Sequence, residues 1–337
     1  MIRLPGPVRG LLLLIIPVLL AFGVYRFLYV SVLTPLNPAD QREISVEISP
    51  GLTFKEICHL LEEKGVIRRA RSLDLLARLR RAPVEKISAG EYLLSASMDP
   101  RAILAKLVSG QVLDRIITVP EGMSIREIGN VVEKAGLISK ADFDRATKDP
   151  GLLARAGVAS SSFEGYLFPD TYKLSRPITP DRVVWLMFEN GEKHWPPEFT
   201  AQADTMRLTR HDILTLASII EKESSKKLEE QPVIASVFHN RLKAGMKLQS
   251  DPTVIYGLKD FNGNLTKEDL MNPHSFNTYV NYGLPPGPIC NPGDGAIKAA
   301  LFPASTPYLY FAADGSGGHV FSTTLTEHNE NVRKYLK

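Results

Sequence analysis

The sequence has few cysteines, little net charge and no spacing typical of metal ligands. The two cysteines, Cys58 and Cys290, have a spacing that gives no support for a disulfide. A net charge of +3, without a dense stripe of Lys and Arg, argues against nucleic acid as a partner. The seven histidines are scattered, and neither H-E-x-x-H nor a paired C-x-x-C occurs, so we expect no metal and no cofactor.

One long hydrophobic run stands near the N-terminus, at residues 10–33, with Arg26 as its only charge. As a helix it would measure roughly 35 Å, which is enough to cross a bilayer. Arg3 and Arg9 precede it, and the positive-inside rule then places residues 1–9 in the cytoplasm and the rest of the chain outside. A cleaved signal peptide is the alternative, but its apolar region is shorter and ends in an A-x-A-like site, which is missing. We predict an uncleaved single-pass anchor.

A repeat follows a linker at residues 34–44. The segments 48–67 and 119–138 align at a shift of 71 residues without gaps, and each follows a β-like run. Thr53 and Ser124 are the expected helix N-caps, and each has a glutamate three residues later, which is the pattern of a capping box. Each helix should end at a glycine. The repeat predicts two small units of strand and helices.

We place these units at residues 45–111 and 112–155, with a second strand of the first unit at Gly90–Leu94. Strand–helix–helix–strand modules of this kind look like the LysM glycan-binding fold. Such a likeness does not establish glycan binding. A spacer that holds a catalytic domain away from the membrane is an equal alternative.

From residue 156 to 337 the pattern predicts a mixed α+β domain. Its last part, around DGSGG, has the pattern of a β-hairpin rather than a nucleophile elbow, because the G-x-S-x-G spacing fails. The predicted elements are helices at 180–195, 209–224 and 229–245, a helix starting at Ser250 or Asp251, an extended loop at 275–293, the hairpin at 307–324 and a terminal helix.

The helix at 209–224 is apolar on nearly all sides and then presents Glu221, Lys222 and Glu223. Periodicity does not choose between the two glutamates, but at least one of them continues a buried face. Burial disfavours the ionised form of a carboxyl group and raises its pKa, as a general acid requires. A glutamate at a frayed helix end, or one paired with a neighbouring Lys or with Arg241, is the simpler alternative.

Five segments carry a resemblance to a known family: 164–174, 216–224, 235–257, 276–293 and 308–329. They look like the catalytic domain of the MltG (YceG-like) endolytic murein transglycosylases, and the anchor and LysM-like region are similar to that family's architecture. The resemblance implies that Glu221 is the catalytic acid. It also implies cleavage of the β-1,4 bond between N-acetylmuramic acid and N-acetylglucosamine within peptidoglycan strands, which leaves 1,6-anhydro ends.

One carboxylate suffices for that chemistry. Ordinary glycosidases use two, one as acid and one as nucleophile or base. A lytic transglycosylase uses the C6 hydroxyl of its own substrate as the nucleophile, held close by the site, and excluding water suppresses hydrolysis. The resemblance further implies a place in the bacterial inner membrane beside peptidoglycan synthases, where cutting nascent strands would end their elongation.

A glycan cleft around Glu221 needs aromatic rings and amide or hydroxyl groups. We expect Asn240 and Arg241 to orient the acid, and Glu164 is a candidate second acidic group. Capping or loop support is an equal alternative for each. The other substrate-binding candidates are Tyr166, Gln249, Ser250, Asp251, Thr253, Tyr256, Asn277, Thr278 and Tyr279.

Two other functions stay open. A hydrolase of the lysozyme type would need a second carboxylate near Glu221, with Glu164 or Asp251 as the nearest candidates. A non-catalytic glycan-binding anchor that recruits wall synthases would not need Glu221 at all.

Overall fold

The computed structural model describes residues 6–224 and 227–335. They divide into two compact units, of which the first holds the chain up to residue 115 together with 174–177, and the second holds the remainder. Residues 1–5 of the predicted cytoplasmic tail lie outside the described part of the chain, as do the side chains at 6–9 of that tail and at 11–14, 27, 28 and 31 of the predicted anchor. Within that part, we find no helix with both the length and the apolar character needed to span a membrane.

The first unit contains the first copy of the repeat. Strands β1 and β2 pair antiparallel, with Ile44 opposite Leu94, and the predicted second strand is therefore confirmed. Val46 and Tyr92 are completely buried beneath the helices. The elements are α1 (Gly6–Leu33), β1 (Ile44–Ile48), α2 (Phe54–Glu63), α3 (Ala70–Leu79), η1 (Val84–Lys86), β2 (Gly90–Leu94) and α4 (Pro100–Val108).

Both predicted capping boxes are present. Thr53 and Ser124 each accept from the backbone N–H three residues on, and the glutamate there accepts from the N-cap N–H. Gly65 and Gly136 follow the two helices with φ of +69° and +67°, the left-handed conformation that ends a helix most easily at glycine. Local sequence therefore accounts for the start and the end of both helices.

The second unit contains the rest of the repeat and the C-terminal helices. Strand β4 pairs with β3, and most residues of both strands belong to this unit, while Asp114, Arg115, Leu174 and Ser175 are grouped with the first. The elements are β3 (Asp114–Val119), α5 (Ile125–Lys134), α6 (Lys140–Ala146), α7 (Pro150–Ala156), β4 (Asp170–Ser175), α8 (Pro180–Lys193), α9 (Pro197–Thr205), α10 (Arg210–Glu223), η2 (Leu228–Glu230), α11 (Gln231–Lys243), α12 (Asp251–Gly257), α13 (Lys267–Met271), α14 (Asp294–Leu301), β5 (Tyr310–Ala313), β6 (His319–Ser322) and α15 (Leu325–Tyr335).

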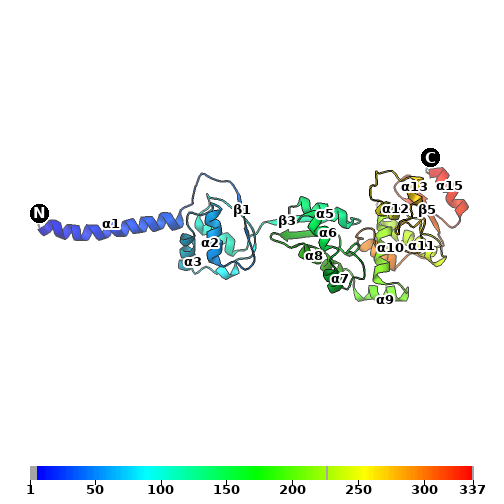
Figure 1. Cartoon of the computed structure of the whole chain (residues 1–337), viewed down its shortest axis with the longest axis horizontal. Helices are drawn as coiled ribbons and strands as arrows, with labels where there is room; N and C mark the ends of the chain where they lie inside the picture. The colour runs from blue at the N-terminus through cyan, green and yellow to red at the C-terminus, as the bar shows by residue number, and fades with distance from the viewer. Residues whose placement is uncertain (1–5, 225–226, 336–337) are drawn as a thin grey trace. The chain divides into compact units, whose positions relative to one another are not determined.

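Helix α10 is the central helix of the C-terminal part of this unit (Figure 1). It contacts α9, α11, α12 and α14, and every residue from Ile213 to Glu221 is buried. A helix covered on all sides must be apolar on all sides, which explains its sequence. The hydroxyl groups of Thr215 and Ser218 donate to backbone carbonyls within the helix, each at 2.7 Å, so they are buried with their hydrogen bonds satisfied.

Candidate active site

Glu221 occupies the last turn of α10, and its side chain is 5% exposed. Its Oε2 accepts from the backbone N–H of Gly293, at 3.0 Å. Burial is the main cause that raises the pKa of Glu221. The Gly293 hydrogen bond lowers this pKa, neighbouring Glu121 raises it, and Lys222 lowers it. A raised pKa favours the protonated form, which is the form that a general acid needs.

The turn between β3 and α5 forms one wall around this carboxyl group. The N–H of Gly122 donates to the carbonyl of Asn291, and the N–H of Asn291 donates to the carbonyl of Met123, both at 2.9 Å. The Lys222 ammonium donates to the Gly122 carbonyl at 3.3 Å. Gly122 has φ of +79°, and a Cβ there would lie 3.5 Å from Cγ of Glu221. The second copy of the repeat therefore packs directly against the end of α10.

The side chain of Asn291, which is completely buried, holds this wall in place. Its Oδ1 accepts from the N–H groups of Gly165 and Leu167, both at 2.9 Å. Its Nδ2 donates to the carbonyl of Met123 at 2.9 Å and to Oε1 of Glu164 at 3.2 Å. One amide thus joins three segments that are far apart in the sequence.

Glu164 is buried beside that amide. It accepts from the N–H of Ile125, the first residue of α5, at 3.0 Å, and from the Tyr256 hydroxyl at 3.0 Å. Burial raises the pKa of Glu164 to about 7, against the hydrogen bonds from Ile125 and Tyr256, which favour the ionised form. Its contacts give Glu164 a role in joining α5 to α12.

A cleft of about 910 Å³ opens next to this group, a size at the upper end of typical ligand sites. Glu164 and Tyr256 line it, as does Lys222, the residue after Glu221. Glu221 is not among the described residues that line this cleft. Phe261 adds an aromatic ring and Arg126 adds positive charge, so the lining combines apolar surface with polar groups that suit a carbohydrate.

A second polar cluster lies beyond the end of α10, around Glu223. The Ser250 hydroxyl donates to Glu223 Oε1 at 2.6 Å. Burial raises the pKa of Glu223 to about 7 despite that hydrogen bond, and Asp251 adds to the rise. Thr278 accepts from the N–H of Ser250 at 3.0 Å, and its hydroxyl lies 2.8 Å from that of Thr253. Four of the predicted residues are therefore brought together, but around Glu223 rather than Glu221.

Three other predicted residues shape the same loops. The N–H of Gln249, which has φ of +51°, donates to the carbonyl of Thr278 at 3.1 Å. The Tyr279 hydroxyl donates to Asp251 at 2.6 Å. Asn277 is buried, and its amide donates to the carbonyl of Asn272 at 2.7 Å. These contacts are those of loop support, which the sequence left open for each of them.

Asn240 and Arg241, predicted to orient the acid, face another part of the fold. The Asn240 amide donates to the carbonyls of Thr306 and Tyr308, at 2.8 and 2.9 Å. The Arg241 guanidinium donates to the carbonyl of Leu309 at 2.6 Å. These contacts join α11 to the chain that leads into β5. They are contacts of fold support, and a role of either residue in orienting Glu221 stays a prediction.

Tyr166 also lies away from the acid. Its hydroxyl is 2.9 Å from Nδ1 of His211, and the two rings stack. His211 is in the first turn of α10, ten residues before Glu221, which corresponds to about 15 Å along a helix. Tyr166 therefore supports the opposite end of α10.

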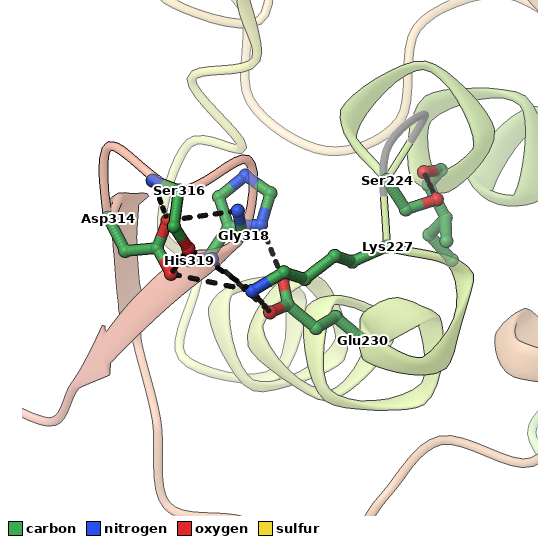
Figure 2. Close-up of polar contacts among 8 residues, drawn as sticks. Ser224, Lys227, Glu230, Asp314, Ser316, Gly318 and His319 are labelled. Carbon is green, nitrogen blue, oxygen red and sulfur yellow. Dashed lines mark hydrogen bonds and ion pairs between the residues drawn. The ribbon is translucent and has the colours of Figure 1, made fainter.

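The chain after α10 is tied to the tip of the β5–β6 hairpin by charged groups (Figure 2). Nδ1 of His319 lies 2.7 Å from Glu230, and the Lys227 ammonium lies 3.6 Å from Asp314. Asp314 also accepts from the N–H of Gly318 at 2.9 Å, which closes the hairpin turn. The predicted hairpin is confirmed, and its tip holds the segment that leads from α10 to α11.

Three residues at this site were missed by sequence reasoning: Glu121, Asn291 and Gly293. Asn291 and Gly293 belong to a loop whose Pro and Gly content indicated only extended chain. Glu121 belongs to the repeat, where its partner in the first copy is Pro50. That mismatch was a signal in the sequence, because it places a carboxylate in the second copy next to the glycine that both copies share.

Comparisons with known proteins agree across nearly the whole chain. The model of the YceG-like family matches residues 46–334. A Bacillus subtilis protein named endolytic murein transglycosylase is 33% identical over 326 residues, which cover 92% of this chain and 90% of that protein. A Streptococcus pneumoniae serotype 2 protein of the same name is 29% identical, and the match covers 96% of this chain and 64% of that protein.

A solved structure is also similar. The 2.6 Å crystal structure of a yceG-like protein from Listeria monocytogenes has 32% sequence identity and a TM-score of 0.59 to this chain. The match covers 86% of this chain and 99% of the Listeria chain.

Proposed function

The chain belongs to the YceG-like family, and on that premise we propose that it is an endolytic murein transglycosylase, like the relatives that carry this name. The observation that carries the proposal is the buried carboxyl group of Glu221 at the end of α10, with a raised pKa and one fixed hydrogen bond. We propose this residue as the general acid and base.

In the proposed reaction, Glu221 donates its proton to the oxygen that joins N-acetylmuramic acid to N-acetylglucosamine. The bond from C1 of the muramic acid to that oxygen breaks, and N-acetylglucosamine leaves with a hydroxyl group. The C6 hydroxyl of the muramic acid then attacks C1, and ionised Glu221 takes its proton. A 1,6-anhydro ring forms, no water is consumed, and Glu221 is protonated again.

The hydrogen bond from Gly293 supports this cycle in both of its states. Because Oε2 accepts from Gly293, Oε1 is the oxygen that carries the proton in the neutral acid. After the proton has left, the same N–H and the nearby Lys222 stabilise the carboxylate, since both lower the pKa of Glu221. Burial alone would weaken the acid, so that it would hold its proton but give it up less readily.

We propose that the glycan lies in the cleft beside Lys222 and Tyr256, and that the LysM-like unit at 45–111 binds strands before they reach it. We also propose that the run at 10–33 anchors the chain in the inner membrane, beside peptidoglycan synthases, with its N-terminus in the cytoplasm. Support comes from α1, which is continuous from Gly6 to Leu33 and leaves side chains such as Leu19 and Phe22 exposed. Carbonate extraction of membranes would release the chain if this anchor does not exist.

The test is mass spectrometry of muropeptides released from purified peptidoglycan by the full chain. Glu221→Gln is compared with Glu229→Gln, the same change at an exposed position in η2. Wild type and Glu229→Gln should release anhydro-ended products, and Glu221→Gln should release none. Reducing ends would indicate a hydrolase with a second carboxylate. Equal products from Glu221→Gln would contradict its role as the acid.

A further inference from the structure

A second carboxyl group meets the same glycine as Glu221. A Cβ built on Gly293 would lie 1.8 Å from Oε1 of Glu121 and 2.2 Å from its Cδ, so this carboxyl group rests directly on the Gly293 backbone. The N–H of that glycine donates to Oε2 of Glu221. Glu121 comes from the β3–α5 turn and Glu221 from the end of α10, and Gly293 brings the two acidic groups together.

We propose that Glu121 is a positioning residue for catalysis, a second carboxylate that the β3–α5 turn places beside Glu221 to keep the acid protonated. The inference rests on the proposed function, because it assumes that Glu221 is the acid. The second copy of the repeat would then act directly on the catalytic acid, in addition to any role as a spacer or in glycan binding.

The first copy of the repeat shows that the fold does not require a carboxylate at the position of Glu121. Gly51 and Gly122 match in the two copies, and both have positive φ, but Glu121 matches Pro50. The strand–turn–helix unit therefore forms without a carboxylate at this position. The Glu121 turn is bound to the loop that carries Gly293, through the hydrogen bonds of Asn291.

The two carboxyl groups differ in their surroundings. Glu121 is exposed, whereas Glu221 is buried. The groups that face Glu221 are Glu121 from the turn, Lys222 from its own helix and the buried Cys290 thiol from the 275–293 loop. Lys222 opposes Glu121, but its ammonium also donates to the Gly122 carbonyl. A nearby negative charge disfavours a second one, so the proton stays on Glu221.

The experiment measures the initial rate of anhydromuropeptide release against pH. Glu121→Gln removes the charge and keeps the shape. The high-pH limb of its pH–rate profile should move to lower pH by about 0.5–1 unit. The rate should therefore fall about three- to tenfold at pH values above the limb and stay near the wild-type rate at lower pH. Glu121→Asp retains the charge, so its high-pH limb should lie between those of Glu121→Gln and the wild type. Glu229→Gln is the matched control and should follow the wild-type profile.

Gly293→Ala tests the same contact without changing any charge. The new methyl group overlaps the Glu121 carboxyl group, whose flexible side chain must move away, and the backbone N–H that binds Glu221 remains. This variant should shift the limb in the same direction as Glu121→Gln, and the double variant should shift it no further.

An unchanged profile in both Glu121→Gln and Gly293→Ala overturns the inference and leaves the proposed function intact. A loss of rate by the same factor at every pH also overturns it, because a purely structural role predicts that result. Full activity of Glu221→Gln contradicts instead the role of Glu221 as the acid in the proposed function. A carboxyl ¹³C NMR titration of Glu221, assigned by its loss in Glu221→Gln, measures the shift without turnover and separates the two failures.

Discussion

Loss of the buried Asn291 side chain should destabilise the candidate active site. Asn291→Ala removes an amide that accepts from the N–H groups of Gly165 and Leu167 and donates to Met123 and Glu164. The Met123 carbonyl keeps its bond from the Asn291 backbone, but the two N–H groups lose their acceptor in a fully buried place. Each unsatisfied buried donor costs about 1–3 kcal/mol. We expect the free energy of unfolding to fall by about 3–5 kcal/mol.

Urea unfolding followed by tryptophan fluorescence measures this change, because Trp185 and Trp195 both belong to the second unit. Asn264→Ala, at an exposed loop position, is the control and should change stability by less than about 0.5 kcal/mol. A loss below about 1 kcal/mol for Asn291→Ala would refute the reasoning, since it would mean that the four hydrogen bonds are replaced at little cost.

Three further predictions concern single groups. The pKa of Glu164 in the folded state, about 7, lies above its usual 4.5. The free energy of unfolding of the wild type should therefore fall as pH rises from 4.5 through 7, by on the order of 3 kcal/mol. The urea midpoint of Glu164→Gln should not show this pH dependence. Burial raises the pKa of the Cys58 thiol to about 12 and that of Cys290 well above its usual value, so a thiol reagent should label neither before unfolding. Thr53→Ala should lower the melting temperature through about 1 kcal/mol of lost capping, and an unchanged midpoint would contradict the cap.

The sequence by itself determined many of the local elements, whereas the choice of Glu221 over Glu223 came from the resemblance to a known family. The capping boxes at Thr53 and Ser124 depend on residues three positions apart, and a short window of sequence contains the whole interaction. The burial of α10 was visible for a similar reason, since a helix that is apolar on all sides has few other environments available to it. The hairpin followed from its Gly-rich turn between two β-rich runs.

Only the tertiary structure decided what surrounds Glu221. Its hydrogen bond to Gly293 joins residues 72 positions apart, and the contact of Asn291 with Met123 spans 168. No local sequence pattern predicts such a contact, because the contact depends on how the helices and turns pack against one another. The same packing directed Asn240 and Arg241 toward β5 and placed Glu121, a residue that a local view assigns to an exposed turn, beside the buried acid.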